Sequence, residues 1–414
     1  MEIVGRLRVY GVQAYFFMFF FILFFRHKNI DLVRIPFFLL IIWQMFKKKL
    51  SPKFLIDPVS VAIFSFVLTA AVSNTINGIP LDEIVKIANW LFPFYLGKYV
   101  IMRCPEIELE NILSCLLICA TAFSVIGIAG YLMGWDTIFG RPLFDAGRYR
   151  FTISGTNRAG FYLGISLVLG TYFFVRRKIS FDVKYLLAVF CWMTIFASLF
   201  LIKERKTILT VMAIVTILLL VYRRYKVVIV GALALALVLS VIPIPERYHP
   251  RQMALNVGML GRFNAWETAI GLFREKPVFG HGYPSFKEAC RRYNEENGDK
   301  LRFKKFQYYS IAHNLSLNAL AETGFLGFLA LNAVFFNAWR FYRYRHRDKS
   351  LFILGVTIGF IYVTMQFGNF VHSTARTDLA FLIVGLYLSF ERYRQSGTVA
   401  RPVGADNRKE GPEA

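Results

Sequence analysis

Hydrophobic residues along this chain fall into long runs, and short charged segments separate these runs from one another. A helix needs about 20 apolar residues to cross a bilayer, and runs of roughly that length recur from end to end. Backbone groups in lipid must be satisfied internally, so we expect these runs to be helices. The pattern predicts about twelve transmembrane helices, at residues 9–25, 33–47, 57–74, 84–101, 109–133, 159–176, 184–202, 207–222, 227–243, 314–339, 351–370 and 376–391.

The predicted fold class is therefore all-α: a polytopic membrane protein with one long, partly helical loop at 244–313. Arg6 and Arg8 precede the first run as in a signal peptide, but no small-residue cleavage site follows, so we expect an uncleaved anchor. Residues 1–395 are expected to form the transmembrane domain. Residues 396–414, rich in Gly, Pro and charge, are expected to be a disordered tail.

The long loop contains a segment with helical periodicity, at residues 260–293. Phe263, Trp266, Ile270 and Phe273 recur at helical spacing, and we interpret this stripe as a packing face. Pro277 is expected to end the helix, and the sequence GHGYPSF predicts a turn. A second helix is expected from Ser285, so that the loop forms a helical cap over the bundle.

Composition agrees with a membrane protein, since apolar residues make up 56% of the 414 and 43 are Phe. The net charge of +23 is better explained by the positive-inside rule than by nucleic-acid binding. If twelve helices alternate, the most basic connections all fall on one side, which we assign to the cytoplasm together with both termini. These connections are 47–53, 176–184, 223–226, 340–349 and 391–395.

Three basic connections fall on the opposite side, where the insertion bias does not require them. They are residues 140–160 with Arg158, the short turn 203–207 with Arg205 and Lys206, and the loop 244–313 with Arg262. Arginine binds phosphate well because its planar guanidinium is permanently charged and bidentate. The cluster predicts an anionic ligand; the simpler alternative is that these residues are solvated or bind lipid headgroups.

His313 is the candidate general base on that side, at the mouth of the tenth predicted helix and next to Asn314. The unperturbed pKa of histidine, near 6.5, suits proton transfer. Glu322 lies nine residues later, about 13.5 Å along an unbroken helix and on its opposite side, which excludes a direct pair with His313. We expect Glu322 to cap a helix end or pair with a basic group, with Thr323-Gly324 as a kink.

The sequence contains no Walker A, Asp-x-Asp, His-Glu-x-x-His or Gly-x-Ser-x-Gly motif. The five cysteines have no spacing that supports disulfides or zinc binding. We therefore expect no metal and no cofactor. A base and several arginines at the membrane surface fit a lipid-borne diphosphate, whose leaving group the arginines would hold.

Four segments resemble the O-antigen ligase and polymerase superfamily of membrane glycosyltransferases, over roughly residues 150–390. They are SGTNRAGFYLG (154–164), KERKTIL (203–209), GRFNAWETAIGLFREKPVFGHGYPSF (261–286) and AHNLSLNALAETGFLG (312–327). The sequence departs from the family pattern at Glu204, where a small hydroxylated residue is common, and at Pro284, where a glycine is often found.

The resemblance implies metal-independent, inverting glycan transfer from undecaprenyl diphosphate. The matching His313 would activate the acceptor hydroxyl, and Arg205 and Arg262 would bind the diphosphate. Asn314, Glu322, Arg158 and Lys206 are candidate supporting residues.

Ligases of the family use lipid A–core oligosaccharide as acceptor, polymerases use a lipid-linked repeat unit, and related enzymes glycosylate protein. The compact connections favour a ligase in the bacterial inner membrane, with the site facing the periplasm. Expected partners are the lipid-linked donor, lipid A–core, membrane lipids and other polysaccharide-assembly proteins, but no nucleic acid. A transporter of a lipid-linked glycan is the non-enzymatic alternative.

Overall fold

The structure is a computed structural model of the 414-residue chain. It describes residues 2–25, 31–47, 56–103, 108–138, 141–142, 144–145, 148–149, 156–176, 183–202, 204–225, 229, 257–297, 309–337, 339–345, 347–367 and 374–395. The tail 396–414 and almost all of the predicted helix 227–243 lie outside these residues.

Nearly all of the described chain is helical. The helices are α1 (Glu2–Phe25), α2 (Asp31–Phe46), α3 (Pro58–Asn77), α4 (Ile84–Ala88), α5 (Leu91–Arg103), α6 (Leu109–Leu132), α7 (Thr156–Arg176), α8 (Val183–Ile202), α9 (Arg205–Val221), α12 (Val257–Glu275), α13 (Phe286–Asn297), α14 (Leu315–Phe336), the 3-10 helix η5 (Trp339–Tyr344), α15 (Lys349–Gln366) and α16 (Thr374–Gln395).

Two very short hairpins, which the all-α prediction did not include, follow α6. Strand β1 (Thr137–Ile138) pairs with β2 (Arg141–Pro142), and β3 (Phe144–Asp145) pairs with β4 (Arg148–Tyr149).

Each predicted transmembrane stretch within the described residues contains a helix, and 227–243 lies almost entirely outside them. Judged by length and composition alone, six helical segments in the described residues could cross a membrane, which confirms a polytopic helical membrane protein. They are Pro58–Asn77, Leu109–Leu132, Arg158–Arg176, Tyr185–Ile202, Leu315–Tyr344 and Lys349–Gln366. Shorter apolar helices lie at Val9–Phe25, Ile35–Phe46, Leu91–Met102 and Lys206–Val221, and the count of twelve stays a prediction.

Local sequence signals set several helix ends. Asp57 caps α3 by accepting hydrogen bonds from the backbone N–H of Val59 and Ser60 at 2.9 and 3.0 Å, and Pro58 occupies the first turn. The same helix ends at Gly78, whose φ of 66° is the left-handed conformation that glycine adopts most readily.

Glycines allow the closest helix contact in the bundle. A Cβ on Gly97 of α5 would lie 2.7 Å from the Leu386 nitrogen of α16, and one on Gly385 would lie 2.2 Å from the Phe94 carbonyl oxygen. The two backbones therefore touch, a mode of packing that small residues permit between membrane helices.

Several described residues in or beside the basic connections contact one another at one end of the bundle, which we call the basic face. There Arg176 at the end of α7 pairs with Glu110 and Glu108 at the start of α6. The other contacts at this end are Lys349 Nζ to the Val175 carbonyl (3.2 Å), Tyr222 to the Arg345 carbonyl (3.1 Å) and Tyr344 to Glu391 (3.0 Å).

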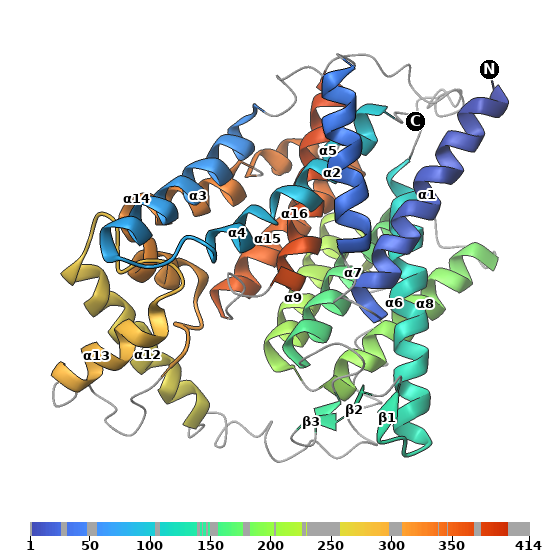
Figure 1. The fold of residues 1–414 in the computed structure, drawn as a ribbon. Coiled ribbons are helices and arrows are strands. Elements are labelled where there is room, and N and C mark those ends of the chain that lie inside the picture. Colours follow the sequence, from blue (N-terminus) through green and yellow to red (C-terminus); the bar gives the residue numbers. More distant parts are fainter. Residues whose placement is uncertain are drawn as a thin grey trace, which may run out of the picture.

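Helix α1 begins on this face and runs parallel to α6, because Cys115 contacts Gln13 and Cys119 contacts Phe17. In Figure 1, α1 begins at the top and α6 ends at the bottom, beside β1.

Helix α14 is broken, which corrects the prediction of one straight helix at 314–339. Gly324 has φ 67° and ψ −165°, outside the helical region. Ser316 Oγ lies 3.3 Å from Asn332 Oδ1, whereas sixteen residues of straight helix would separate them by about 24 Å. The two halves of α14 therefore fold back on each other at Gly324, and the predicted kink is confirmed as a sharp reversal.

Helices α12 and α13 pack beside α14 and enclose a small second core of Ala269, Leu272, Phe286, Cys290 and neighbouring residues. Figure 1 shows both helices beneath the α3–α14 pair, away from α1, α6 and α8.

The predicted packing stripe on α12 was wrong in part. Phe263 and Ile270 are 43% and 41% exposed, and the buried face carries small side chains such as Ala265 and Ala269. Small residues fit there because α14 and α13 approach α12 closely.

Candidate functional site

The end of the bundle opposite the basic face holds the described site residues. Lys206, in the first turn of α9, donates a hydrogen bond from Nζ to the carbonyl of Phe367, just after α15 (3.3 Å). Arg158 lies half-buried near the start of α7. Because α7 ends on the basic face, its start belongs to this second end, which we call the site face.

Glu204 fixes the turn between α8 and α9. Its carboxylate is buried, accepts a hydrogen bond from Thr207 Oγ1 at 2.9 Å, and lies 3.3 Å from Lys206 Nζ. It also fills the space where a Cβ on Gly160 of α7 would stand. The glycine of the sequence TNRAG thus lets this buried carboxylate reach the start of α7. Arg205 begins α9, but its side chain lies outside the described residues.

Arg262 of α12 also interacts electrostatically with Glu204. Its side chain is partly buried, and burial lowers the pKa of the guanidinium while the negative charge of Glu204 acts to raise it. Arginine stays protonated at any physiological pH even so. Glu204 therefore faces Lys206 of α9, a predicted supporting residue, and Arg262 of α12, a predicted diphosphate ligand.

His313 occupies a strained turn just before α14. Its φ of 53° is in the left-handed region, which is uncommon for residues other than glycine. The next residue, Asn314, caps α14 by accepting a hydrogen bond from the Leu317 N–H at 2.9 Å. Strain of this kind persists only where surrounding contacts hold it, and it is often found at functional sites.

Tyr309 connects His313 to the neighbourhood of Arg262. The Tyr309 ring lies edge-on to the His313 ring, with centroids 6.4 Å apart. Its hydroxyl lies where a Cβ on Gly261 would project, so the phenol packs against the residue that precedes Arg262. The predicted base and one predicted arginine are thus joined through one aromatic side chain.

Two hydrogen bonds hold the Glu322 carboxylate. Its Oε1 accepts a hydrogen bond from the Phe286 N–H at 3.1 Å, and Phe286 is the first residue of α13. The expectation that Glu322 caps a helix end is confirmed, although the helix belongs to the loop. Its Oε2 accepts a hydrogen bond from Asn318 Nδ2 at 2.6 Å.

The turn between α12 and α13 forms backbone hydrogen bonds with both sides of the break in α14. Backbone N–H groups of His281 and Gly282 donate to the carbonyls of Ala321 and Glu322, at 3.0 and 2.8 Å. The Phe325 N–H donates to the Pro277 carbonyl at 2.8 Å. These contacts satisfy backbone groups that the reversal at Gly324 removes from helical pairing, which an apolar environment requires.

Sequence reasoning missed three contributors to the site. Glu204 was noted only as a departure from the family pattern, and Tyr309 was not singled out. Asn318 had a signal that could have found it, because it lies four residues before Glu322, the spacing that brings side chains together on a helix.

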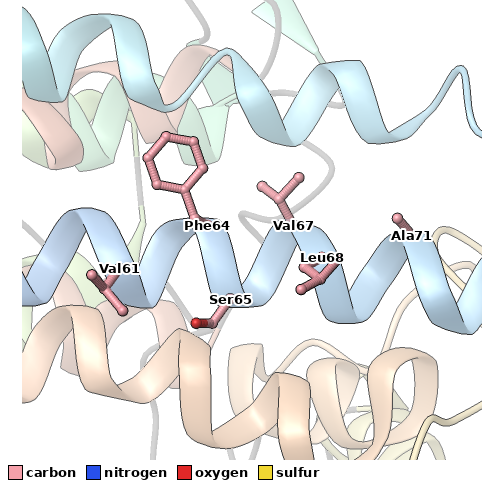
Figure 2. Close-up of a pocket in the computed structure, with 6 residues that line it drawn as sticks. All are labelled: Val61, Phe64, Ser65, Val67, Leu68 and Ala71. Carbon is pink, nitrogen blue, oxygen red and sulfur yellow. The ribbon is translucent and has the colours of Figure 1, made fainter. Parts of the chain in front are cut away.

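A shallow apolar depression lies on α3, apart from the site residues. Figure 2 shows the residues that line it, all from α3: Val61, Phe64, Ser65, Val67, Leu68 and Ala71. Leu68 is 64% exposed there. An exposed apolar surface on a membrane-length helix is expected to face lipid.

Comparison with known proteins shows a family similarity over part of the chain. Residues 190–332 match the protein family described as O-antigen ligase. The chain is also similar to an uncharacterized protein of Haemophilus influenzae, 26% identical over 106 residues, which are 24% of this chain and 26% of the relative. The match to that relative thus spans about a quarter of its length.

The family match encloses the positions of Arg205, Arg262, His313 and Glu322, whereas Arg158 lies before it. The match over residues 190–332 supports membership of the O-antigen ligase superfamily.

Proposed function

We propose that this protein is an O-antigen ligase that transfers a glycan from undecaprenyl diphosphate to a hydroxyl of lipid A–core oligosaccharide. The observation that carries the proposal is the family match over residues 190–332, which encloses His313, Arg205 and Arg262. Support comes from the shared site face and from Tyr309, which packs between the His313 ring and Gly261.

In the proposed reaction His313 removes the proton from the acceptor hydroxyl. The hydroxyl oxygen attacks the anomeric carbon, and the bond from that carbon to the diphosphate oxygen breaks with inversion. The leaving undecaprenyl diphosphate keeps the electron pair, and Arg205 and Arg262 stabilise its charge. Lys206 and Arg158 add positive charge, while Asn314 and Glu322 support the His313 turn.

The proposed topology has twelve transmembrane helices, with the basic face in the cytoplasm and the site face in the periplasm of the bacterial inner membrane. The supporting argument is electrostatic, because Lys and Arg are enriched in cytoplasmic loops. The contacts of Arg176, Arg345 and Lys349 gather at one end of the bundle. In this arrangement the lipid-linked donor and the lipid A–core acceptor meet at the outer leaflet.

The function is tested by the lipopolysaccharide of cells that carry only a His313→Ala variant. We expect normal expression and lipid A–core without attached glycan. The matched control is His346→Ala, in the basic segment 340–349, which should leave lipopolysaccharide unchanged. Capped lipopolysaccharide at the wild-type level in His313→Ala cells would contradict the proposed role of His313.

Deleting the gene separates the ligase from the repeat-unit polymerase. Loss of a ligase leaves bare core and accumulates long lipid-linked polymer. Loss of a polymerase leaves core that bears a single repeat unit, and that outcome would replace the proposal with the polymerase. Loss of glycan from protein with intact lipopolysaccharide would identify a protein glycosyltransferase instead.

A further inference from the structure

A chain of hydrogen bonds connects the first residue of α13 with the turn that holds His313. Glu322 Oε1 accepts from the Phe286 N–H at 3.1 Å, and Glu322 Oε2 accepts from Asn318 Nδ2 at 2.6 Å. Asn318 Oδ1 in turn accepts from the Ala312 N–H at 3.1 Å. Ala312 is fully buried and precedes His313 directly.

The polarity of this chain is fixed by its two ends. Both ends are backbone N–H groups, which can only donate, so the side chains between them must present an acceptor to each. Asn318 accepts from the Ala312 N–H through Oδ1 and therefore donates through Nδ2. Both oxygens of Glu322 must then accept, one from Asn318 and one from the Phe286 N–H. A carboxylate does this, and an amide of the same shape cannot.

Burial makes an unsatisfied donor in this series of hydrogen bonds costly. Glu322 and Asn318 are 1% and 0% exposed, so a donor that faces another donor there has no water to bond instead. The Glu322 carbonyl also accepts from Ser73 Oγ of α3 at 3.0 Å, which holds the residue from a second direction. Glu322 is thus held at its backbone carbonyl by α3 and the α12–α13 turn, and at its carboxylate by α13 and Asn318.

We infer that Glu322 and Asn318 form a directed relay that positions the left-handed turn of His313 and couples it to the start of α13. Both are positioning residues, since the relay reaches His313 through the backbone of Ala312. The relay deepens the proposed function, and it rests on that function only for the claim that His313 acts on substrate.

Exchange of the two side-chain types provides a sharp test. In Glu322→Gln, every orientation of the two amides leaves one pair of donors facing each other, either at Phe286, between the side chains, or at Ala312. In Asn318→Asp, two carboxylates face each other at the former 2.6 Å contact. The double variant Asn318→Asp/Glu322→Gln restores every bond with the middle one reversed and keeps the total charge.

The first readout is the NMR titration of imidazole signals in the full-length protein in detergent, with His313 assigned by its loss in His313→Ala. The second is the pH profile of kcat/KM for glycan transfer.

Each single variant should shift the His313 signal and lower kcat/KM by about tenfold or more, the scale expected when a charge-assisted bond that orients a reacting group is lost. The double variant should return both readouts to near the wild-type values. Glu288→Gln, an exposed change on α13, should alter neither.

Wild-type His313 signals in a folded Glu322→Gln protein would overturn the relay. A double variant no better than the single variants, or one that does not fold, would overturn it as well, because its bonds are all satisfied. If the signals behave as expected but His313→Ala keeps full transfer activity, the relay stands and the proposed role of His313 falls.

Discussion

At the scale of single residues, the ionisable groups on the loop side of the molecule are held by specific partners. His281 in the α12–α13 turn is buried, with Nε2 3.0 Å from the Leu272 carbonyl and Nδ1 3.0 Å from Arg292 Nη2. Nδ1 must be unprotonated to accept from arginine, so the ring is neutral and Nε2–H donates to Leu272. Glu275 Oε2 lies 3.4 Å from Nε2.

This environment predicts a pH-dependent stability. Burial above all, with Lys276 and Arg292 adding to it, lowers the pKa of His281 to about 4 from the ordinary value of 6.5, although the bond to Leu272 opposes the shift. The unfolded chain therefore binds a proton near pH 6 that the folded chain does not. The stabilisation is complete above about pH 6.5 and is lost as the pH falls toward 4, by on the order of 3 kcal/mol.

Thermal unfolding in detergent between pH 4 and 8 checks this expectation. His281→Gln has no titrating ring, so its melting temperature should decline less over that range than that of the wild-type protein. Parallel curves for the two proteins would show that His281 does not titrate as described.

At the scale of elements, α14 shows where sequence patterns stop being informative. Apolar residues continue on both sides of Glu322-Thr323-Gly324, so hydropathy averaged over the segment predicts one long helix. The reversal depends on the turn 277–282, whose backbone groups replace the lost helical bonds. Such a tertiary contact leaves no periodic signal, whereas the kink itself could be predicted from the glycine.

Gly324→Ala should therefore destabilise the protein strongly. A Cβ at this position would lie 2.2 Å from the Val278 carbonyl oxygen, and φ 67° with ψ −165° is a conformation that essentially only glycine adopts. We expect a loss of at least about 3 kcal/mol in the free energy of unfolding, from the strain and the clash together.

Gly359→Ala is the matched control, because nothing lies within 4 Å of a Cβ there and the residue is inside α15. It should be neutral or stabilise by up to about 1 kcal/mol. Equal melting temperatures for the two variants would contradict the strained reversal at Gly324.

At the scale of the whole molecule, the bundle has a basic face and a site face. The alternation of apolar runs and charged connections predicted most of this arrangement, because hydropathy and the insertion bias act on each segment separately. The sequence also predicted the kink at Gly324. It could not predict that Glu204 would lie against Gly160 or that Tyr309 would pack on Gly261, since these contacts join segments that are distant in the chain.

The basic end of the bundle depends on a buried ion pair between α3 and α5. Lys98 Nζ lies 2.5 Å from Asp57 Oδ2, and both side chains are almost fully buried. Lys98→Met leaves the Asp57 carboxylate uncompensated and should cost about 3–5 kcal/mol of stability. The double variant Asp57→Asn/Lys98→Met should recover most of this loss, because asparagine still accepts the capping bonds of α3.

Arg176→Met provides the comparison in a calorimetric or thermal melt. Its ion pair with Glu110 is 43% exposed on the Arg176 side, so its loss should cost no more than about 1 kcal/mol. A Lys98→Met protein as stable as Arg176→Met would show that the buried pair is unimportant for the packing of α3 on α5.

The proposed ligase activity is tested by glycan transfer with the purified protein in detergent, with an undecaprenyl diphosphate-linked glycan as donor and lipid A–core as acceptor. Donor and acceptor have no defined side there, so a transporter would give no product. The wild-type protein is expected to form glycosylated lipid A–core, and His313→Ala should be slower by at least about 100-fold, the scale of general base catalysis. Absence of product with the wild-type protein would contradict the proposed ligase activity, and undiminished product with His313→Ala would contradict the role of His313 as general base.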